Sequence, residues 1–127
     1  MAEAPDQPKS VAMQIKRDVP GIYANNVRFE GNVWDLRILF GQLDRDSAGE
    51  AMIDWRAGVT VPWPLVKILV FFLSTNLYGH EEAQGFLKVP ASQIPKIAPL
   101  SDDATGADKA FYQYALRLHK ELFGETS

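Results

Sequence analysis

The most apolar run of the chain, WPLVKILVFFLSTNLY from Trp63 to Tyr78, limits the possible fold more than any other stretch. Pro64 stands at its start, where a proline has its φ preset for a helix and lacks an N–H that would find no partner there. At about 100° per residue, the apolar side chains fill an arc of roughly 200° and leave a narrow polar strip around Lys67 and Ser74. The run therefore predicts a helix that must be covered on most of its sides.

Three environments are possible for this helix. A membrane span needs about 20 predominantly apolar residues, and we expect none here, because the run is shorter and contains polar residues. The first expectation is a core helix with one side on a sheet. The alternative is a core helix whose second side meets another subunit, since apolar area beyond what one sheet covers is typical of an interface. The candidate interface residues are Trp63, Lys67, Phe71 and Tyr78.

Glycines and prolines set the expected ends of the helices. The helical pattern of the apolar run continues to Gln84, so we predict a helix near residues 64–84, ended by Gly85 in a left-handed conformation. A second, one-faced amphipathic helix is predicted near 107–123, with Gly124 as its stop.

The part of the chain between the two helices contains Pro90, Pro95 and Pro99. Prolines at this spacing exclude a helix and a central strand. We therefore predict a short edge strand at 86–89, followed by an extended segment that wraps the domain.

The N-terminal half alternates with a period of two, which is typical of strands. We predict strands near 22–30, 33–43 and 51–61. Gly31-Asn32 suits a two-residue hairpin turn, because both residues tolerate positive φ. That turn fixes a register in which facing residues share a face, whereas a longer loop would break the pairing of Arg28 with Asp35. The predicted facing pairs are Phe29 with Trp34, Val27 with Leu36, Tyr23 with Phe40 and Arg28 with Asp35.

Short connections make neighbours in sequence neighbours in space. The predicted fold is therefore α+β: an antiparallel β-meander of three to four strands packed on a central apolar helix, plus a C-terminal amphipathic helix. Residues 1–20 are predicted to be a flexible tail and a short extended arm, and residues 21–127 a single domain.

Composition narrows the functional classes. The chain has no cysteine, which excludes disulfides, iron–sulfur clusters, thiolate zinc sites and cysteine nucleophiles. A net charge of −3, with Lys and Arg scattered along the sequence, lacks the basic patch typical of nucleic-acid binders. The first ten residues contain no apolar h-region, so neither a secretory signal nor an anchor is expected and a cytoplasmic location is predicted.

Potential catalytic or metal-binding groups crowd together at one place, His80-Glu81-Glu82. Adjacent residues on a helix point in different directions, so we interpret this cluster as a solvated helix end and keep His80 and Glu81 as weak polar-site candidates. His119 is interpreted as a surface residue. The loop 43–50 has too few acidic ligands in place for calcium. We predict no catalytic, cofactor or metal residue and no cofactor.

The three tryptophans allow one other type of site, an aromatic surface. Trp34 and Trp55 fall on the predicted inner faces of adjacent strands and are expected in the core. Trp63, between two prolines at the start of the helix, is the expected exposed or interfacial aromatic residue.

The chain resembles the domain of unknown function 3467, a bacterial and archaeal family. The resemblance rests on Tyr23-Ala24-Asn25-Asn26-Val27 and on Asp35-Leu36-Arg37-Ile38-Leu39-Phe40-Gly41. It continues through a strand at 59–61 and a helix with Lys67 and Leu73, then Glu81, Gly85, Leu87 and Pro90, and so covers roughly residues 22–90. The chain departs from the family pattern at Pro62-Trp63, where a polar capping residue is usual. The resemblance implies a small α+β domain and no known activity.

The expected function is a non-enzymatic protein-interaction or scaffold module that forms a homodimer or larger homo-oligomer through the Trp63–Tyr78 helix or a sheet edge. One alternative is a small-molecule-binding protein or enzyme with an aromatic pocket near Trp63, with His80 and Glu81 as its polar groups. A weaker alternative is a nucleic-acid accessory protein that uses Arg28, Arg37 and Arg56.

Overall fold

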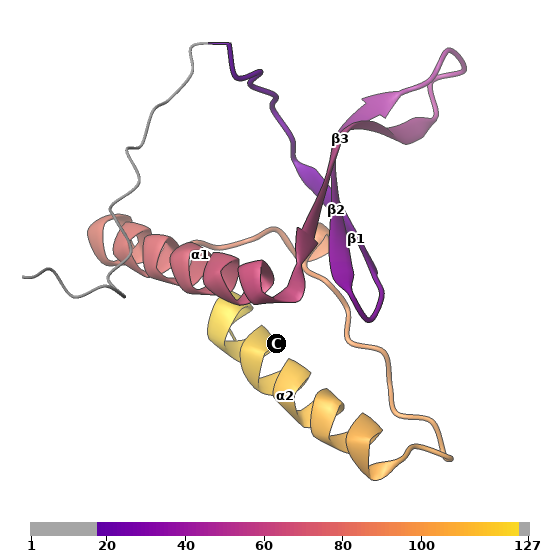
Figure 1. Cartoon of the computed structure of the whole chain (residues 1–127), viewed down its shortest axis with the longest axis vertical. Coiled ribbons are helices and arrows are strands. Elements are labelled where there is room, and N and C mark those ends of the chain that lie inside the picture. Colours follow the sequence, from indigo (N-terminus) through magenta and orange to yellow (C-terminus); the bar gives the residue numbers. More distant parts are fainter. Residues whose placement is uncertain (1–17, 125–127) are drawn as a thin grey trace, which may run out of the picture. The chain divides into compact units, whose positions relative to one another are not determined.

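The structure is a computed structural model that describes residues 18–124. Most of the predicted N-terminal tail and arm, residues 1–17, lies outside the described range. Along the chain follow β1 (Asn26–Gly31), β2 (Asp35–Arg45), β3 (Ala51–Pro62), α1 (Trp63–Gln84), the single 3₁₀ turn η1 (Ala91–Gln93) and α2 (Gly106–Phe123) (Figure 1).

The predicted α+β class is confirmed. The three strands form one antiparallel sheet in the order β1-β2-β3, and one helix follows the strands while the other lies near the C-terminus. The edge strand predicted at 86–89 is wrong, because this stretch forms no strand. The N–H of Leu87 donates instead to the Glu81 carboxylate at 2.8 Å, and Pro90 lacks an N–H, so little of the stretch is free for strand pairing.

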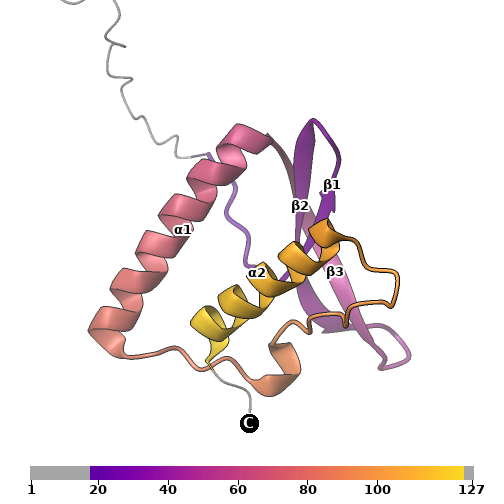
Figure 2. The ribbon, with the colours of Figure 1, turned by 90° about the horizontal axis from the view of Figure 1, so that it is seen from below.

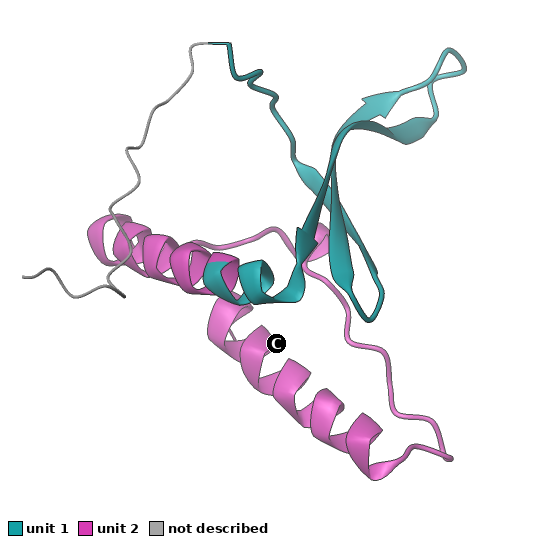
Figure 3. Cartoon of the chain, viewed as in Figure 1, with its two compact units in different colours: residues 1–68 teal, residues 69–127 magenta. Residues whose placement is uncertain are grey.

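The chain forms two compact units, Met1–Ile68 and Leu69–Ser127 (Figure 3). Their boundary lies within α1, one turn and a half after its start. The first unit contains the sheet, and the second contains most of α1 together with α2. Packing of the sheet on α1 within one domain stays a prediction.

The β1–β2 hairpin differs from the predicted register by four residues. Phe29 pairs with Ile38 and Val27 with Phe40, where Trp34 and Leu36 had been predicted. The turn is centred two residues later, at Val33-Trp34, and the Asn32 side chain organises it: its Oδ1 accepts from the N–H groups of Trp34 and Asp35 at 2.7 and 2.9 Å, and the Asn32 N–H donates to the Asp35 carbonyl at 3.0 Å. Such Asx turns are a common use of asparagine.

The register error leaves the assignment of faces intact, because side chains alternate with a period of two and the shift is even. Arg28 faces Leu39 instead of Asp35. Tyr23, predicted opposite Phe40, precedes β1 and is unpaired in the sheet. Trp34, predicted in the core, lies in the loop and is 82% exposed.

A β-bulge interrupts the pairing of β2 with β3. Phe40 pairs with Ala57 and Gly41 with Trp55, so Arg56 is an extra residue on β3. The bulge reverses the alternation, and Trp55 therefore lies on the opposite face from Val59 and Val61, not on the same face as predicted. A Cβ on Gly41 would lie 2.7 Å from the Trp55 ring, which requires glycine at this close approach.

One face of the sheet is apolar between the turn and the bulge. Strand registers place eight residues on this apolar sheet face. Only Leu36 and Val61 are buried among the hydrophobic residues that the structure describes. Both lie next to the start of α1, whereas Val27 and Val59 at the two edge strands are about half exposed. The apolar sheet face consists of Val27, Phe29, Leu36, Ile38, Phe40, Ala57, Val59 and Val61.

Both predicted helix stops are confirmed. Gly85 has φ 92° and Gly124 has φ 79°, and the N–H of each donates to the carbonyl four residues earlier.

In the second unit, the segment that links η1 to α2 lies alongside α2 and runs in the opposite direction. η1 therefore lies near the end of α2, and residues 96–104 lie near its start (Figures 1 and 2). The predicted wrapping segment therefore packs along α2.

Candidate functional site

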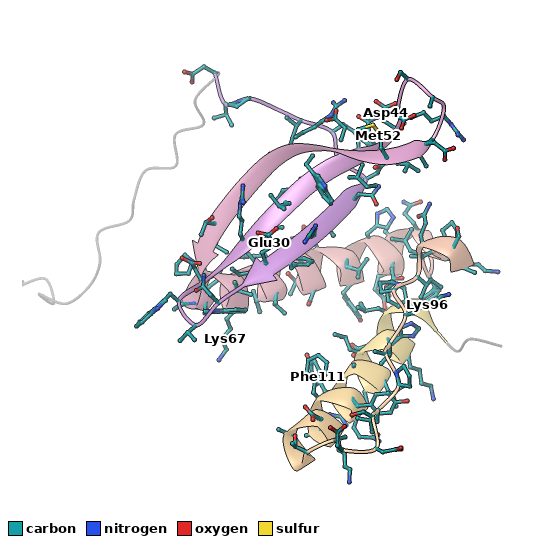
Figure 4. All side chains as sticks on the ribbon, turned by 90° about the vertical axis from the view of Figure 1, so that its right-hand side faces the viewer. Glu30, Asp44, Met52, Lys67, Lys96 and Phe111 are labelled. Atoms are coloured by element: carbon teal, nitrogen blue, oxygen red, sulfur yellow. The ribbon has the colours of Figure 1, made fainter. Side chains whose placement is uncertain are left out.

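The exposed surface of α1 is the main candidate. None of its 22 residues is buried. Phe71 and Tyr78, two of the four candidate interface residues, are 62% and 68% exposed. Lys67, one turn before Phe71, is also exposed and projects from the helix in Figure 4. Because these residues recur at spacings of four and seven, they lie along one side of the helix.

Exposed apolar side chains also lie on other sides of α1. Ile68, Val70, Phe72 and Leu73 are each at least half exposed. Two polar side chains on the helix are satisfied locally, since Thr75 Oγ1 and Asn76 Nδ2 both donate to the carbonyl of Phe72, at 3.1 and 2.7 Å. This surface can therefore contact a partner through its apolar side chains, and not through hydrogen bonds from Thr75 or Asn76.

Trp63 has a structural role as well as an exposed edge. Its Nε1–H donates to the carbonyl of Asn32 at 2.8 Å. Its ring lies over Gly31, where an added Cβ would be 3.5 Å from both the Trp63 ring and Leu36. The residue is still 42% exposed. Trp63 therefore closes the β1–β2 turn against the start of α1 and leaves only part of its ring for a partner.

The aromatic-pocket alternative requires Trp63, His80 and Glu81 to converge. Trp63 begins α1, and His80 is seventeen residues further along the same helix, about 25 Å at 1.5 Å per residue. Glu81 already accepts a hydrogen bond from the Leu87 N–H. Within one copy of the chain, α1 therefore holds the tryptophan and the two polar groups apart.

The three arginines of the nucleic-acid alternative have acidic partners. Arg28 and Arg37 both lie near Glu30, at 3.8 and 3.9 Å, and Arg56 lies 3.3 Å from Asp54. All of these side chains are exposed, so each ion pair contributes little to stability. The pairs do lower the positive charge that this face could offer to a phosphate backbone.

A groove that the sequence did not indicate lies in the second unit. It has a volume of about 570 Å³ and lies between the start of α2 and the segment 96–104. Phe111 projects from α2, and Lys96 lies on the preceding segment (Figure 4). Helical spacing of Phe111, Tyr112 and Ala115 was the available signal, but their partner segment could not be identified from periodicity. The groove is lined by Lys96, Ile97, Ala98, Pro99, Leu100, Ser101, Ala104, Asp108, Phe111, Tyr112 and Ala115.

His119, interpreted as a surface residue, has a definite contact. Its Nε2 lies 3.0 Å from the carbonyl of Pro95, and since a carbonyl can only accept, the imidazole donates. Its ring also meets Phe123 edge-on at 5.0 Å. His119 therefore ties the wrapping segment to α2.

Between residues 18 and 124, no three acidic or histidine side chains come close enough together to hold a metal ion. In the same part of the chain, no helix has the length and apolarity that crossing a membrane requires.

Comparison with known protein families, curated proteins and solved structures gave no match.

Proposed function

We propose that this chain is a non-enzymatic interaction module that self-associates into a homodimer or larger homo-oligomer, with the exposed side of α1 as part of the interface. The observation that carries the proposal is that α1, 22 residues long, has no buried residue although many of its own side chains are large and apolar. Exposed apolar patches of this kind mark interaction sites on soluble proteins.

The energetics of folding support the same proposal. Burying one side chain of the size of leucine or valine gains about 1.5–3 kcal/mol, whereas ordering one backbone residue costs about 1–2 kcal/mol. Leu36 and Val61 are the hydrophobic residues of the described range that are buried, so much of the apolar area of the strands and helices stays exposed to solvent. A second copy of the chain would supply the missing burial.

The test compares two neighbouring phenylalanines on α1. Phe71 and Phe72 are 62% and 56% exposed, and their rings meet edge-on with centroids 5.5 Å apart, but their Cα–Cβ bonds point about 100° apart around the helix axis. We expect the unmodified chain to have a multiple of the 14.2 kDa mass in native mass spectrometry and in sedimentation over a dilution series. Phe71→Glu should shift it toward the single-chain mass, while the control Phe72→Glu should shift it less.

Three results would count against parts of this proposal. A mass of one chain at every concentration would refute self-association. Equal effects of the two substitutions, with helix content unchanged by circular dichroism, would refute the assignment of the Phe71 side of α1. A small molecule retained by chain purified from its host would favour the alternative of a ligand-binding protein.

A further inference from the structure

We propose that the outer edge of β3 pairs with the same edge of a second copy, in antiparallel orientation and with the two-fold axis at Val59. Two three-stranded sheets would then join into one sheet of six strands. The inference rests on the proposed self-association and names a surface and a register for it. It concerns the β3 edge segment, defined as Ala57–Val61.

Contacts near Asn25 show whether the N–H and C=O groups of each β2 residue face β1 or β3. The N–H of Asn25 donates to the carbonyl of Gly41 at 3.0 Å, and the N–H of Leu43 donates to Asn25 Oδ1 at 3.0 Å. Odd-numbered residues of β2 thus direct their backbone groups toward the β1 side. Because these groups alternate along a strand, the even-numbered residues direct theirs toward β3.

The register of β2 with β3 then identifies the free groups on β3. Ile38 pairs with Val59 and Leu36 with Val61, so Val59 and Val61 direct their N–H and C=O groups inward. Gly58 and Thr60 direct theirs outward. β3 is an edge strand, and in the described part of the chain no strand lies beside it to accept these groups.

A two-fold axis at Val59 makes this edge complementary to itself. It places Gly58 opposite Thr60 of the second copy and Thr60 opposite its Gly58, which forms four backbone hydrogen bonds. Val59 then faces Val59 of the second copy on the apolar sheet face. The β3 edge segment contains no charged residue that would oppose this pairing. Shifting the axis by one residue would involve either Pro62, which has no N–H, or the bulge at Arg56.

The other edge of the sheet lacks this complementarity. On β1 the outward groups belong to Val27 and Phe29, so the corresponding two-fold axis lies at Arg28. That arrangement sets two arginines directly opposite each other, and like charges in facing positions are destabilising. Charged side chains of this kind protect edge strands from pairing, whereas the β3 edge segment has no such protection.

Cysteine cross-linking tests the register, because the native chain contains no cysteine. Val59→Cys would place two thiols in a pair without backbone hydrogen bonds, where Cα atoms lie about 4.5 Å apart, within the range that a disulfide spans. Val27→Cys is the matched control, since Val27 and Val59 are 49% and 46% exposed on the same sheet face. We expect mild oxidation to link most of the Val59→Cys chains into dimers and at least tenfold fewer of the Val27→Cys chains.

A second pair of variants measures affinity. Val59→Lys should raise the dimer dissociation constant at least tenfold, because two lysines would face each other, and Val27→Lys should change it less than threefold. If the chain is an oligomer but Val59→Cys cross-links no better than Val27→Cys, this inference is wrong and the proposed self-association stands. If the unmodified chain is a monomer at every concentration, both are wrong.

Discussion

Trp63 joins two parts of the chain that lie far apart in the sequence. Its indole N–H donates to the carbonyl of Asn32, 31 residues away. The Asn32 carbonyl is thereby satisfied from outside the turn, while the Asn32 side chain takes the two N–H groups inside it. One hydrogen bond therefore connects the β1–β2 turn to the start of α1.

We predict that Trp63→Phe destabilises the chain by about 1 kcal/mol, the usual net value of one hydrogen bond, with some further loss from the smaller ring. Trp34→Phe is the matched control, because Trp34 is 82% exposed, and it should change stability by less than about 0.5 kcal/mol. Urea denaturation of both variants measures the difference. Equal midpoints for the two would show that the Trp63 hydrogen bond has no net stabilising effect.

At the level of elements, α2 begins with a reciprocal cap. The N–H of Asp108 donates to Thr105 Oγ1 at 3.1 Å, and the N–H of Thr105 donates to the Asp108 carboxylate at 2.9 Å. The hydrogen bond from the Thr105 backbone, and then that from its side chain, lowers the pKa of Asp108 below its ordinary value. This cap satisfies two donors that a helix start otherwise leaves to water.

The lowered pKa of Asp108 gives a pH prediction with a definite sign. A carboxyl group with a lower pKa in the folded state stabilises the fold above its unfolded pKa, and this contribution is lost as the pH falls through the folded value. We expect the stability of α2 to fall below about pH 4, and Asp108→Asn to remove part of that fall. Urea midpoints followed by circular dichroism from pH 7 to pH 2.5 test this, and identical profiles for both chains would contradict it.

The wrapping segment depends on a different contact, that of His119 with the Pro95 carbonyl. We predict that His119→Ala increases amide hydrogen exchange in residues 93–104 severalfold, because the segment loses a tie to α2. The control is His80→Ala, since His80 is exposed on α1. Exchange in residues 93–104 should stay unchanged in that variant. An equal increase in both variants would show that His119 does not hold this segment to α2.

For the whole molecule, the main feature is that only Leu36 and Val61 are buried among the hydrophobic residues of the described range, 18–124. If a second copy supplies the missing burial, folding and association are linked and stability depends on concentration. We predict that the urea midpoint of the native chain rises with each tenfold increase in protein concentration. A midpoint independent of concentration would mean that the single chain folds by itself, and would contradict the proposed function.

Much of the fold follows from local rules. The period of two marked β3 to within one residue, the apolar run with Pro64 and Gly85 gave both ends of α1, and Gly124 gave the end of α2. For the candidate site, the wide apolar arc of α1 was enough to single out Phe71 and Tyr78, which are exposed. These features depend on φ preferences and side-chain periods, which act over a few neighbouring residues.

What only the tertiary structure decided depends on residues far apart in the sequence. The indole N–H of Trp63 binds the carbonyl of Asn32, 31 residues away, and the bulge at Arg56 in the pairing of β2 with β3 places Trp55 on the opposite face of the sheet from Val59 and Val61. The groove beside α2 needs the segment 96–104 to run along Phe111 and Tyr112. Periodicity carries no information on such contacts, because they join residues far apart in the sequence that only the fold brings together.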